Sequence, residues 1–157
     1  MKKITLGLMA TALLLQAGVF DRGSKSVAVT VGSGTGFDNT YTIVGVSANY
    51  FALNGLAVGI GYRGWFGGTP TMNEVDLPVT YFLPLSATFR PYAGVFYRHT
   101  FISGNYDDYE TLGARAGIAY AEGRVYLSVG WAEEWYSRSN GDTIRRGYPE
   151  LTAAISF

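Results

Sequence analysis

Residues 148–157 read YPELTAAISF, and they alternate between two kinds of side chain. The odd-numbered positions of this stretch are apolar: Leu151, Ala153, Ile155 and Phe157. The even-numbered positions are polar or small: Glu150, Thr152, Ala154 and Ser156. Because successive side chains of a β-strand point to opposite faces, this stretch predicts a strand with one apolar face and one polar face.

The same period of two recurs along most of the chain and predicts an all-β protein. We expect eight strands, over residues 24–34, 39–51, 55–66, 73–83, 90–101, 110–121, 125–136 and 147–157. Tight connections are expected at Asn54–Gly55, whose sequence is typical of hairpins, and at 83–89 and 121–124. Longer polar loops are expected at the other four connections: 34–39, 67–73, 103–109 and 137–146. The pattern predicts a closed, eight-stranded, antiparallel up-and-down β-barrel, which has no free sheet edge.

The composition limits the possible functions of the chain. Its 157 residues are enough for one domain, and only 15% of them are charged, compared with about 25% in ordinary soluble domains. The formal net charge is zero and there is no basic cluster, which argues against nucleic-acid binding. The sequence has no cysteine, so we expect no disulfide and no thiolate metal site, and nothing in it calls for a cofactor.

Residues 1–18 are predicted to be a secretory signal peptide, which leaves 19–157 as the barrel domain. Lys2 and Lys3 precede the mostly apolar run Ile4–Leu15, which is too short to span a bilayer as a helix. Ala17 or Gly18 offers the small residue that cleavage requires.

Two classes of barrel share this alternation and differ in the face that meets water. A soluble lipocalin-like barrel turns its apolar face inward, whereas a membrane barrel turns it outward. Here the polar face is mostly Gly, Ala, Ser and Thr, which suits the narrow lumen of eight strands. The charges on that face balance, so we expect them to pair inside the lumen: Arg63, Arg98, Arg115, Asp76, Glu134 and Glu150. Glu74 is expected closer to a rim.

Aromatic residues of the apolar face fall at both ends of the expected strands. At the tight-turn end they are Tyr50, Tyr81, Phe89, Tyr120 and Phe157. At the loop end they are Phe66, Phe101 and Trp135. Two aromatic belts with aliphatic residues between them are typical of barrels that span a membrane, so the pattern favours a transmembrane barrel.

With its signal segment, eight alternating strands and terminal LTAAISF, the chain resembles the small outer-membrane β-barrels of Gram-negative bacteria, the OmpA-like and OmpX-like barrels. The resemblance covers the whole mature chain. It implies location in the cell outer membrane, contact with lipid and lipopolysaccharide, and delivery by periplasmic chaperones to the barrel-assembly machinery. It also implies that this machinery recognises Leu151, Ala153, Ile155 and Phe157 as an assembly signal. The expected role is structural or surface interaction, with a plugged polar lumen.

Two other functions remain open. One is a narrow channel for ions or small apolar compounds. The other is a lipid-modifying enzyme, because His99 lies near the loop-side rim and Ser103 is expected opposite Glu110 on the same outer face. This group resembles the outer-membrane lipid A deacylases. That family places its His and Ser two residues apart, whereas here four residues, about 13 Å of strand, separate them.

Two of the expected loops carry a charge of one sign. Asp107 and Asp108 precede Glu110, but the spacing does not match a calcium loop, and we expect no metal site there. Arg138, Arg145 and Arg146 make the last loop basic, and arginine pairs well with phosphate. A solvated loop is the favoured interpretation, and contact of this loop with lipopolysaccharide phosphates is the alternative.

Overall fold

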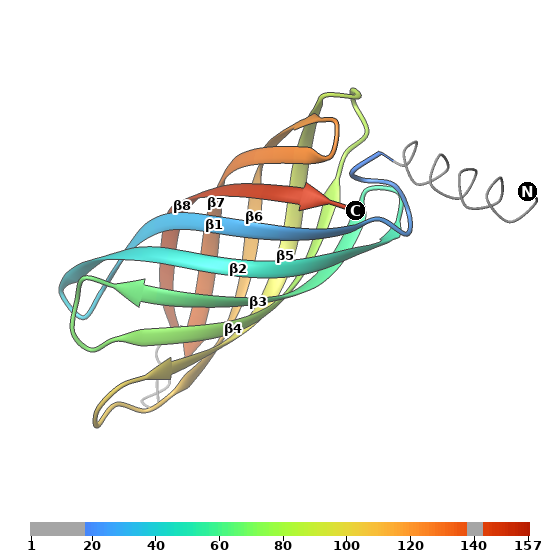
Figure 1. Ribbon diagram of the computed structural model, residues 1–157. Coiled ribbons are helices and arrows are strands. Elements are labelled where there is room, and N and C mark those ends of the chain that lie inside the picture. Colours follow the sequence, from blue (N-terminus) through green and yellow to red (C-terminus); the bar gives the residue numbers. More distant parts are fainter. Residues whose placement is uncertain (1–17, 138–142) are drawn as a thin grey trace, which may run out of the picture.

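The computed structural model describes residues 18–137 and 143–157, which form a closed barrel of eight strands (Figure 1). The strands are β1 (Lys25–Gly36), β2 (Asn39–Leu53), β3 (Leu56–Phe66), β4 (Met72–Phe82), β5 (Phe89–Ile102), β6 (Tyr109–Glu122), β7 (Val125–Ser137) and β8 (Thr143–Ser156). Each strand pairs antiparallel with the next, and β8 returns to pair with β1. The prediction of a closed antiparallel up-and-down barrel is confirmed, and the strand ends differ from those expected by at most four residues.

Two parts of the sequence-based predictions fall outside this description. Residues 1–17 of the predicted signal peptide are not among the described residues, and neither is Arg138 of the last loop. No helix of the described residues is long and apolar enough to cross a membrane.

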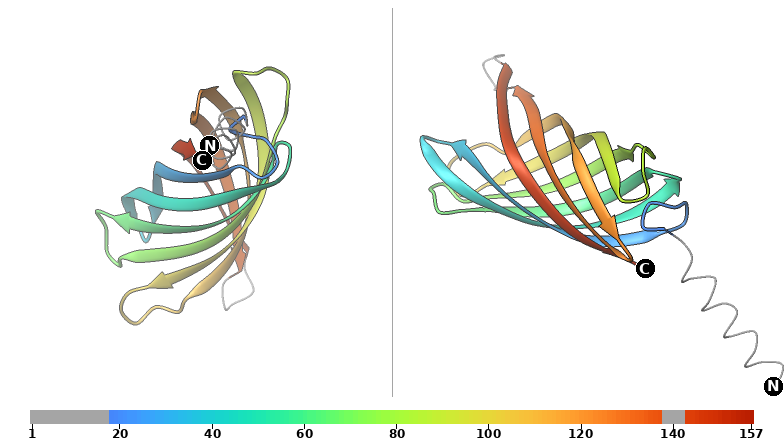
Figure 2. Two further views of the ribbon diagram at one scale, coloured as in Figure 1. Left: turned by 45° about the vertical axis from the view of Figure 1, so that its right-hand side comes forward. Right: turned by 90° about the horizontal axis from the view of Figure 1, so that it is seen from above.

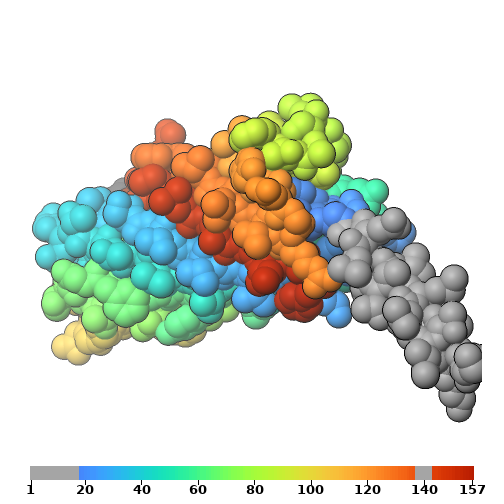
Figure 3. Space-filling model, turned by 45° about the horizontal axis from the view of Figure 1, so that its top comes forward, coloured from blue at the N-terminus to red at the C-terminus, as the bar shows by residue number. Residues whose placement is uncertain are grey.

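Strand β8 closes the barrel against β1. The two strands pair over seven positions, beginning with Ser26 opposite Ser156. The amide of Lys25 then donates to the carbonyl oxygen of Phe157 at 3.2 Å, and the amide of Phe157 donates to the carbonyl oxygen of Lys25 at 2.9 Å. Figure 3 shows β8, in red, lying between β1 and β7. This closure pairs the backbone groups of both end strands, as a hydrocarbon environment requires.

The first loop differs from the expected polar loop at 34–39. Strands β1 and β2 extend to within two residues of each other and are joined by a turn at Phe37 and Asp38. Both residues have positive φ angles, 50° and 59°, as the central residues of a type I′ hairpin turn do. The ring of Phe37 packs on that of Tyr106 at a centroid distance of 4.9 Å, which supports this uncommon backbone. The expected contrast between tight turns at one end and long loops at the other is therefore only partly present.

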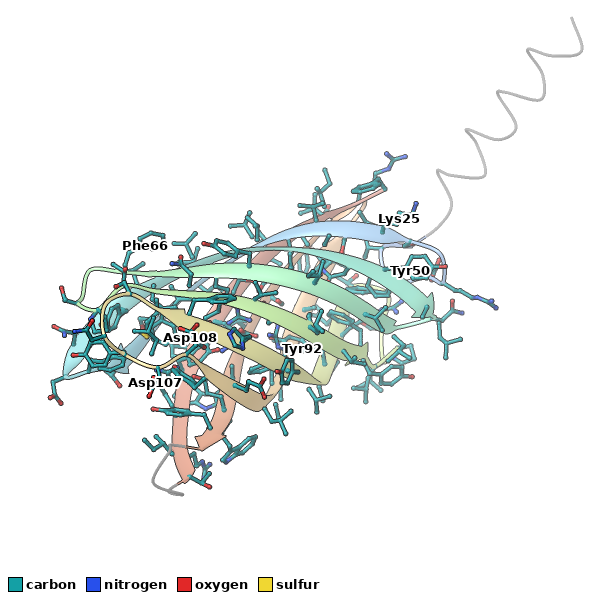
Figure 4. All side chains as sticks on the ribbon, turned by 90° about the horizontal axis from the view of Figure 1, so that it is seen from below. Lys25, Tyr50, Phe66, Tyr92, Asp107 and Asp108 are labelled. Carbon is teal, nitrogen blue, oxygen red and sulfur yellow. The ribbon has the colours of Figure 1, made fainter. Side chains whose placement is uncertain are left out.

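The two faces of the wall differ as the alternation predicts. Outward side chains remain exposed along the middle of the strands, for example Val46 at 53% and Leu151 at 60%. Their chain neighbours on the inner face are small or buried, for example Thr30 at 8%. Figure 2 shows the tilted strands from two further directions, and Figure 4 shows side chains on both faces of the wall. The exposed band is apolar and mostly aliphatic, with aromatic residues such as Tyr62 and Trp131 within it, so the outer face is suited to lipid.

Two apolar layers fill the ends of the lumen. The turn-end layer consists of Val19, Phe20, Ala28, Phe51, Ala57, Phe82, Tyr92, Ala119, Ala121, Tyr126 and Ala154. The loop-end layer consists of Tyr41, Ile43, Trp65, Met72, Phe96, Ala132 and Tyr148. Two members of the turn-end layer, Val19 and Phe20, precede β1, so the chain before the first strand contributes to the filling of that mouth.

Candidate functional site

Between the two apolar layers, an ion-pair network joins charged side chains from six strands. Strand alternation directs these residues inward, because each lies on the polar phase of its strand. The network contains four arginines and four carboxylates: Arg63, Arg98, Arg115, Arg146, Glu74, Asp76, Glu134 and Glu150. Its charges therefore balance.

The half of the network nearer the loop end is centred on Arg98. This arginine is 0% exposed and lies with its Nε 3.3 Å from Oε2 of Glu74. Its Nη1 donates to Glu134, which also accepts a hydrogen bond from Nε of Arg146 at 2.7 Å. The rings of Phe96 and Trp65 cover Arg98 and Arg146, at 4.3 Å and 4.4 Å from the guanidinium carbon. Each buried carboxylate here thus has a cationic partner, which offsets the desolvation of both charges.

The other half of the network is a ring of four charges. Arg63 lies 3.5 Å from Asp76 and 3.8 Å from Glu150. Arg115 lies 3.7 Å and 3.5 Å from the same two carboxylates. The hydroxyl oxygen of Tyr148 joins the halves, since it accepts hydrogen bonds from Nη1 of Arg98 at 2.8 Å and Nη1 of Arg63 at 3.1 Å.

A small polar cavity lies between this ring and the turn-end layer. Its volume is about 50 Å³, and its lining includes all four charges of the ring. The hydroxyl-bearing residues Tyr92 and Tyr126, from the turn-end layer, also line it, and Figure 4 labels Tyr92. A polar cavity of this size is large enough to hold water.

Two network residues differ from what the sequence suggested. Glu74 was expected closer to a rim than the other lumen charges, and it is the third residue of β4, yet its side chain is 0% exposed and pairs with Arg98, so it belongs to the network. Arg146 was expected in a basic loop, whereas it lies in β8 on the inner face. The alternation could have predicted the inward position of Arg146, because residues 146, 148 and 150 lie on the same face of a strand. The other six residues are those that the sequence placed in the lumen.

Strand alternation separates Arg146 from its neighbour Arg145. The Arg145 side chain is 70% exposed and pairs on the outer face with Glu133, which also accepts a hydrogen bond from the indole nitrogen of Trp131 at 2.9 Å. Of these two arginines, only Arg145 is exposed to the surroundings of the barrel. Contact with lipopolysaccharide phosphates stays a prediction, now confined to Arg145 among the described arginines of that loop.

The three residues of the expected nucleophilic site do not come together as predicted. The pairing of Ser103 with Glu110 is wrong, because His99 is the residue opposite Glu110 in the register of β5 and β6. Ser103 lies beyond the end of β5, where its hydroxyl accepts hydrogen bonds from the amide and the hydroxyl of Thr71 at 3.0 Å and 2.9 Å. The His99 ring packs against Phe101 at 4.5 Å. A deacylase-like activity therefore stays a prediction, and the structure does not have the Ser103–Glu110 pairing on which it was based.

The residues of the expected aromatic belts are all exposed on the outer face. Those near the tight turns are Tyr50, Tyr81, Phe89, Tyr120 and Phe157, and those near the loops are Phe66, Phe101 and Trp135. Leu151, Ile155 and Phe157 of the terminal strand are exposed as well, with Ala153 on the same face. Anchoring at lipid headgroups and recognition by the assembly machinery stay predictions. Among the described residues, Asp107, Asp108 and Glu110 form no cluster suited to a metal ion.

Comparison with solved structures connects this architecture to known proteins. The N-terminal β-barrel domain of Pseudomonas aeruginosa OprF superposes with a TM-score of 0.70 at 14% identity, over 87% of this chain and 98% of that chain. The chain has the fold of the small outer-membrane β-barrels. Neisserial surface protein A (NspA) matches this barrel with a TM-score of 0.65 at 15% identity, over 85% of this chain and 96% of that chain.

A designed protein shows how little the fold says about activity. A transmembrane β-barrel made by de novo design matches the barrel with a TM-score of 0.60 at 20% identity, over 87% of this chain and 98% of that chain. No family model and no curated protein sequence matches the chain. The role of this barrel must therefore be argued from its own residues.

Proposed function

We propose that this chain is a plugged, non-conducting barrel in the outer membrane of a Gram-negative bacterium, with a structural or surface-interaction role. The observation that carries the proposal is the continuous filling of the lumen. The turn-end layer, the small polar cavity and the ion-pair network follow one another along the barrel. The loop-end layer interleaves with the network, since Phe96 covers Arg98 and Tyr148 joins the two halves. A structural role needs a stable wall and no passage, and this filling supports both.

The ion-pair network is the main barrier to a passing ion. Arg98, Glu74 and Glu134 are each 0% exposed, so an ion can pass only if these pairs separate. Separation would leave charges without partners in a region of low dielectric, which is strongly unfavourable. Balanced charges also leave no net attraction for one sign of ion. We expect the network to behave as a plug.

The surface-interaction part of the proposal rests on the loop end. Phe37 and Tyr106 are exposed at 38% and 53% and pack against each other across two different loops. This contact gives the rim a defined shape, and Asp107 and Asp108 beside it are exposed and labelled in Figure 4. An exposed aromatic pair is a suitable contact for another molecule.

Single-channel recording in planar lipid bilayers tests the plug. We expect the refolded wild-type barrel to insert without stable conductance steps, because no open path crosses the network. The channel alternative makes a different prediction, in which steps appear and Gly61→Trp abolishes them. A Cβ atom at Gly61 would face the carboxylate of Asp76, so tryptophan there fills the lumen.

The neighbouring position provides the matched control for that recording. Ile60 is 56% exposed on the outer face, so Ile60→Trp adds the same side chain outside the lumen. Steps that persist in Ile60→Trp and disappear in Gly61→Trp would contradict the plug and establish a channel. We expect no stable conductance steps in the wild type or in either variant.

A further inference from the structure

A wide cleft opens at the loop end of the barrel, and we call it the rim cleft. Its volume is about 1220 Å³. Its lining residues come from the turn between β1 and β2, from strands β5, β6 and β7, from the loop between β5 and β6, and from Arg146 of β8. Ligand pockets commonly measure roughly 300–1,000 Å³, so the rim cleft has room for a small organic molecule.

Aromatic rings form much of the wall of the rim cleft. The aromatic residues of its described lining are Phe37, Tyr97, Tyr106, Tyr109, Trp135 and Tyr136. Besides the contact of Phe37 with Tyr106, the ring of Tyr109 stacks on that of Tyr136 at a centroid distance of 4.6 Å. The faces of such rings attract cations, and their apolar surface packs well on methylene groups.

The charge of the lining is negative. Its carboxylates are Asp38, Asp107, Asp108 and Glu110. Its one arginine, Arg146, already pairs with Glu134 and donates a hydrogen bond to the hydroxyl of Tyr109 at 3.2 Å. A concave surface with one sign of charge concentrates ions of the opposite sign. The rim cleft therefore favours a cationic ligand over an anionic one.

The four carboxylates are too dispersed to suit a single metal ion. They come from a turn, a loop and strand β6, and no group of three or more potential metal ligands lies together in the described part of the chain. Asp108 is also held in place, because its Oδ1 accepts a hydrogen bond from the amide of Ile102 at 2.9 Å. Dispersed carboxylates with aromatic rings among them suit an extended ligand, in which apolar segments separate several positive charges.

Thr111 adds an unpaired polar group to the rim cleft. The residue lines the cleft and is only 2% exposed, and its hydroxyl has no hydrogen-bond partner among the residues that the structure describes. A buried hydroxyl without a partner is unfavourable, so a ligand that donates to this oxygen would be favoured. An ammonium group has only donors and therefore fits this oxygen.

We propose that the rim cleft binds a linear polyamine. The ammonium groups pair with the carboxylates of the two loops and of β6, one of them donates to the hydroxyl of Thr111, and the methylene segments lie on the aromatic rings. The inference names a ligand for the surface-interaction part of the proposed function and rests on that part. It does not depend on whether the lumen conducts.

Isothermal titration calorimetry tests the proposal, with spermidine as the probe and the barrel held in phosphatidylcholine nanodiscs. Phosphatidylcholine has no net charge, and nanodiscs without the barrel provide the blank. We expect saturable binding to the wild type. Asp107→Asn combined with Asp108→Asn should weaken it by about tenfold, because two ion pairs are lost. The matched control, Asp21→Asn combined with Glu122→Gln, removes the same charge outside the cleft and should leave the affinity unchanged.

Two single variants separate a built site from a merely acidic surface. Tyr106→Leu removes a ring and should weaken spermidine binding by about threefold. Thr111→Val removes the hydroxyl while keeping the shape of the side chain, and it should also weaken binding by about threefold. An acidic surface alone would respond to neither variant and would bind Mg²⁺ as tightly as spermidine.

Three results would overturn the proposal: no saturable binding, equal weakening by both double variants, or full affinity in Tyr106→Leu and Thr111→Val. These results are distinct from a failure of the plug. A silent barrel that does not bind spermidine would refute the ligand alone, whereas a conducting barrel that binds it would refute the plug alone.

Discussion

Replacing Arg98 with methionine is expected to lower the free energy of unfolding by about 3–5 kcal/mol, because breaking a buried ion pair leaves an uncompensated charge. Arg98 is the only partner of Glu74 in the network and one of two partners of Glu134. Methionine fills much of the same volume but supplies no charge. Reversible urea unfolding in lipid vesicles, followed by tryptophan fluorescence, measures the change.

A double variant separates the charge effect from a packing effect. Arg98→Met combined with Glu74→Gln removes the orphaned carboxylate, so it should be more stable than Arg98→Met alone. Arg22→Met, at an exposed position outside the network, should change stability by less than about 0.5 kcal/mol. If Arg98→Met proved no more destabilising than Arg22→Met, the network would not hold the lumen together.

Val29→Arg should destabilise the barrel in vesicles by about 2–4 kcal/mol, as arginine does at the midplane of a bilayer. Val29 lies in the middle of the outward residues of β1, opposite Val46 on β2 and Ala153 on β8. Its side chain is 46% exposed, so arginine meets no steric obstacle and must instead place its charge in hydrocarbon. The same urea titration measures the effect.

Ser33→Arg is the matched control for depth. Ser33 lies on the same face of β1, four residues nearer the loop end, where arginine should reduce stability by only about 0–1 kcal/mol. A water-soluble barrel would expose both positions to solvent and tolerate both substitutions equally. Equal effects at the two positions would therefore contradict the membrane assignment.

The sequence was most informative where alternation alone determines position. In β8, it placed Glu150 in the lumen and Leu151 on the outer face, and the structure has both there. Alternation predicts which face of the wall a residue lies on. It does not predict the position of the residue along the barrel axis, because the strands are tilted and their register is staggered. Alternation therefore placed Glu74 on the correct face but did not predict that it pairs with Arg98 on the neighbouring strand.

Features that do not follow the two-residue alternation of a strand were not predicted from the sequence. The segment before β1 is irregular, so nothing in the alternation predicted that Phe20 would enter the mouth of the barrel. The turn at Phe37 and Asp38 was expected to be part of a longer loop. Two successive non-glycine residues with positive φ angles are uncommon in proteins, so the sequence did not indicate a two-residue turn there. The ring of Phe37 packs on that of Tyr106, which comes from another loop and is distant in the sequence.

Spin labelling of β8 in lipid vesicles tests the central claim, that the apolar face meets lipid and the polar face lines a filled lumen. The chain has no cysteine, so single cysteines at positions 151–155 can be labelled without background. We predict that labels at 151, 153 and 155 collide with dissolved oxygen, while labels at 152 and 154 are protected from it. The opposite phase, or collision of the odd-numbered labels with a water-soluble nickel chelate, would contradict the account.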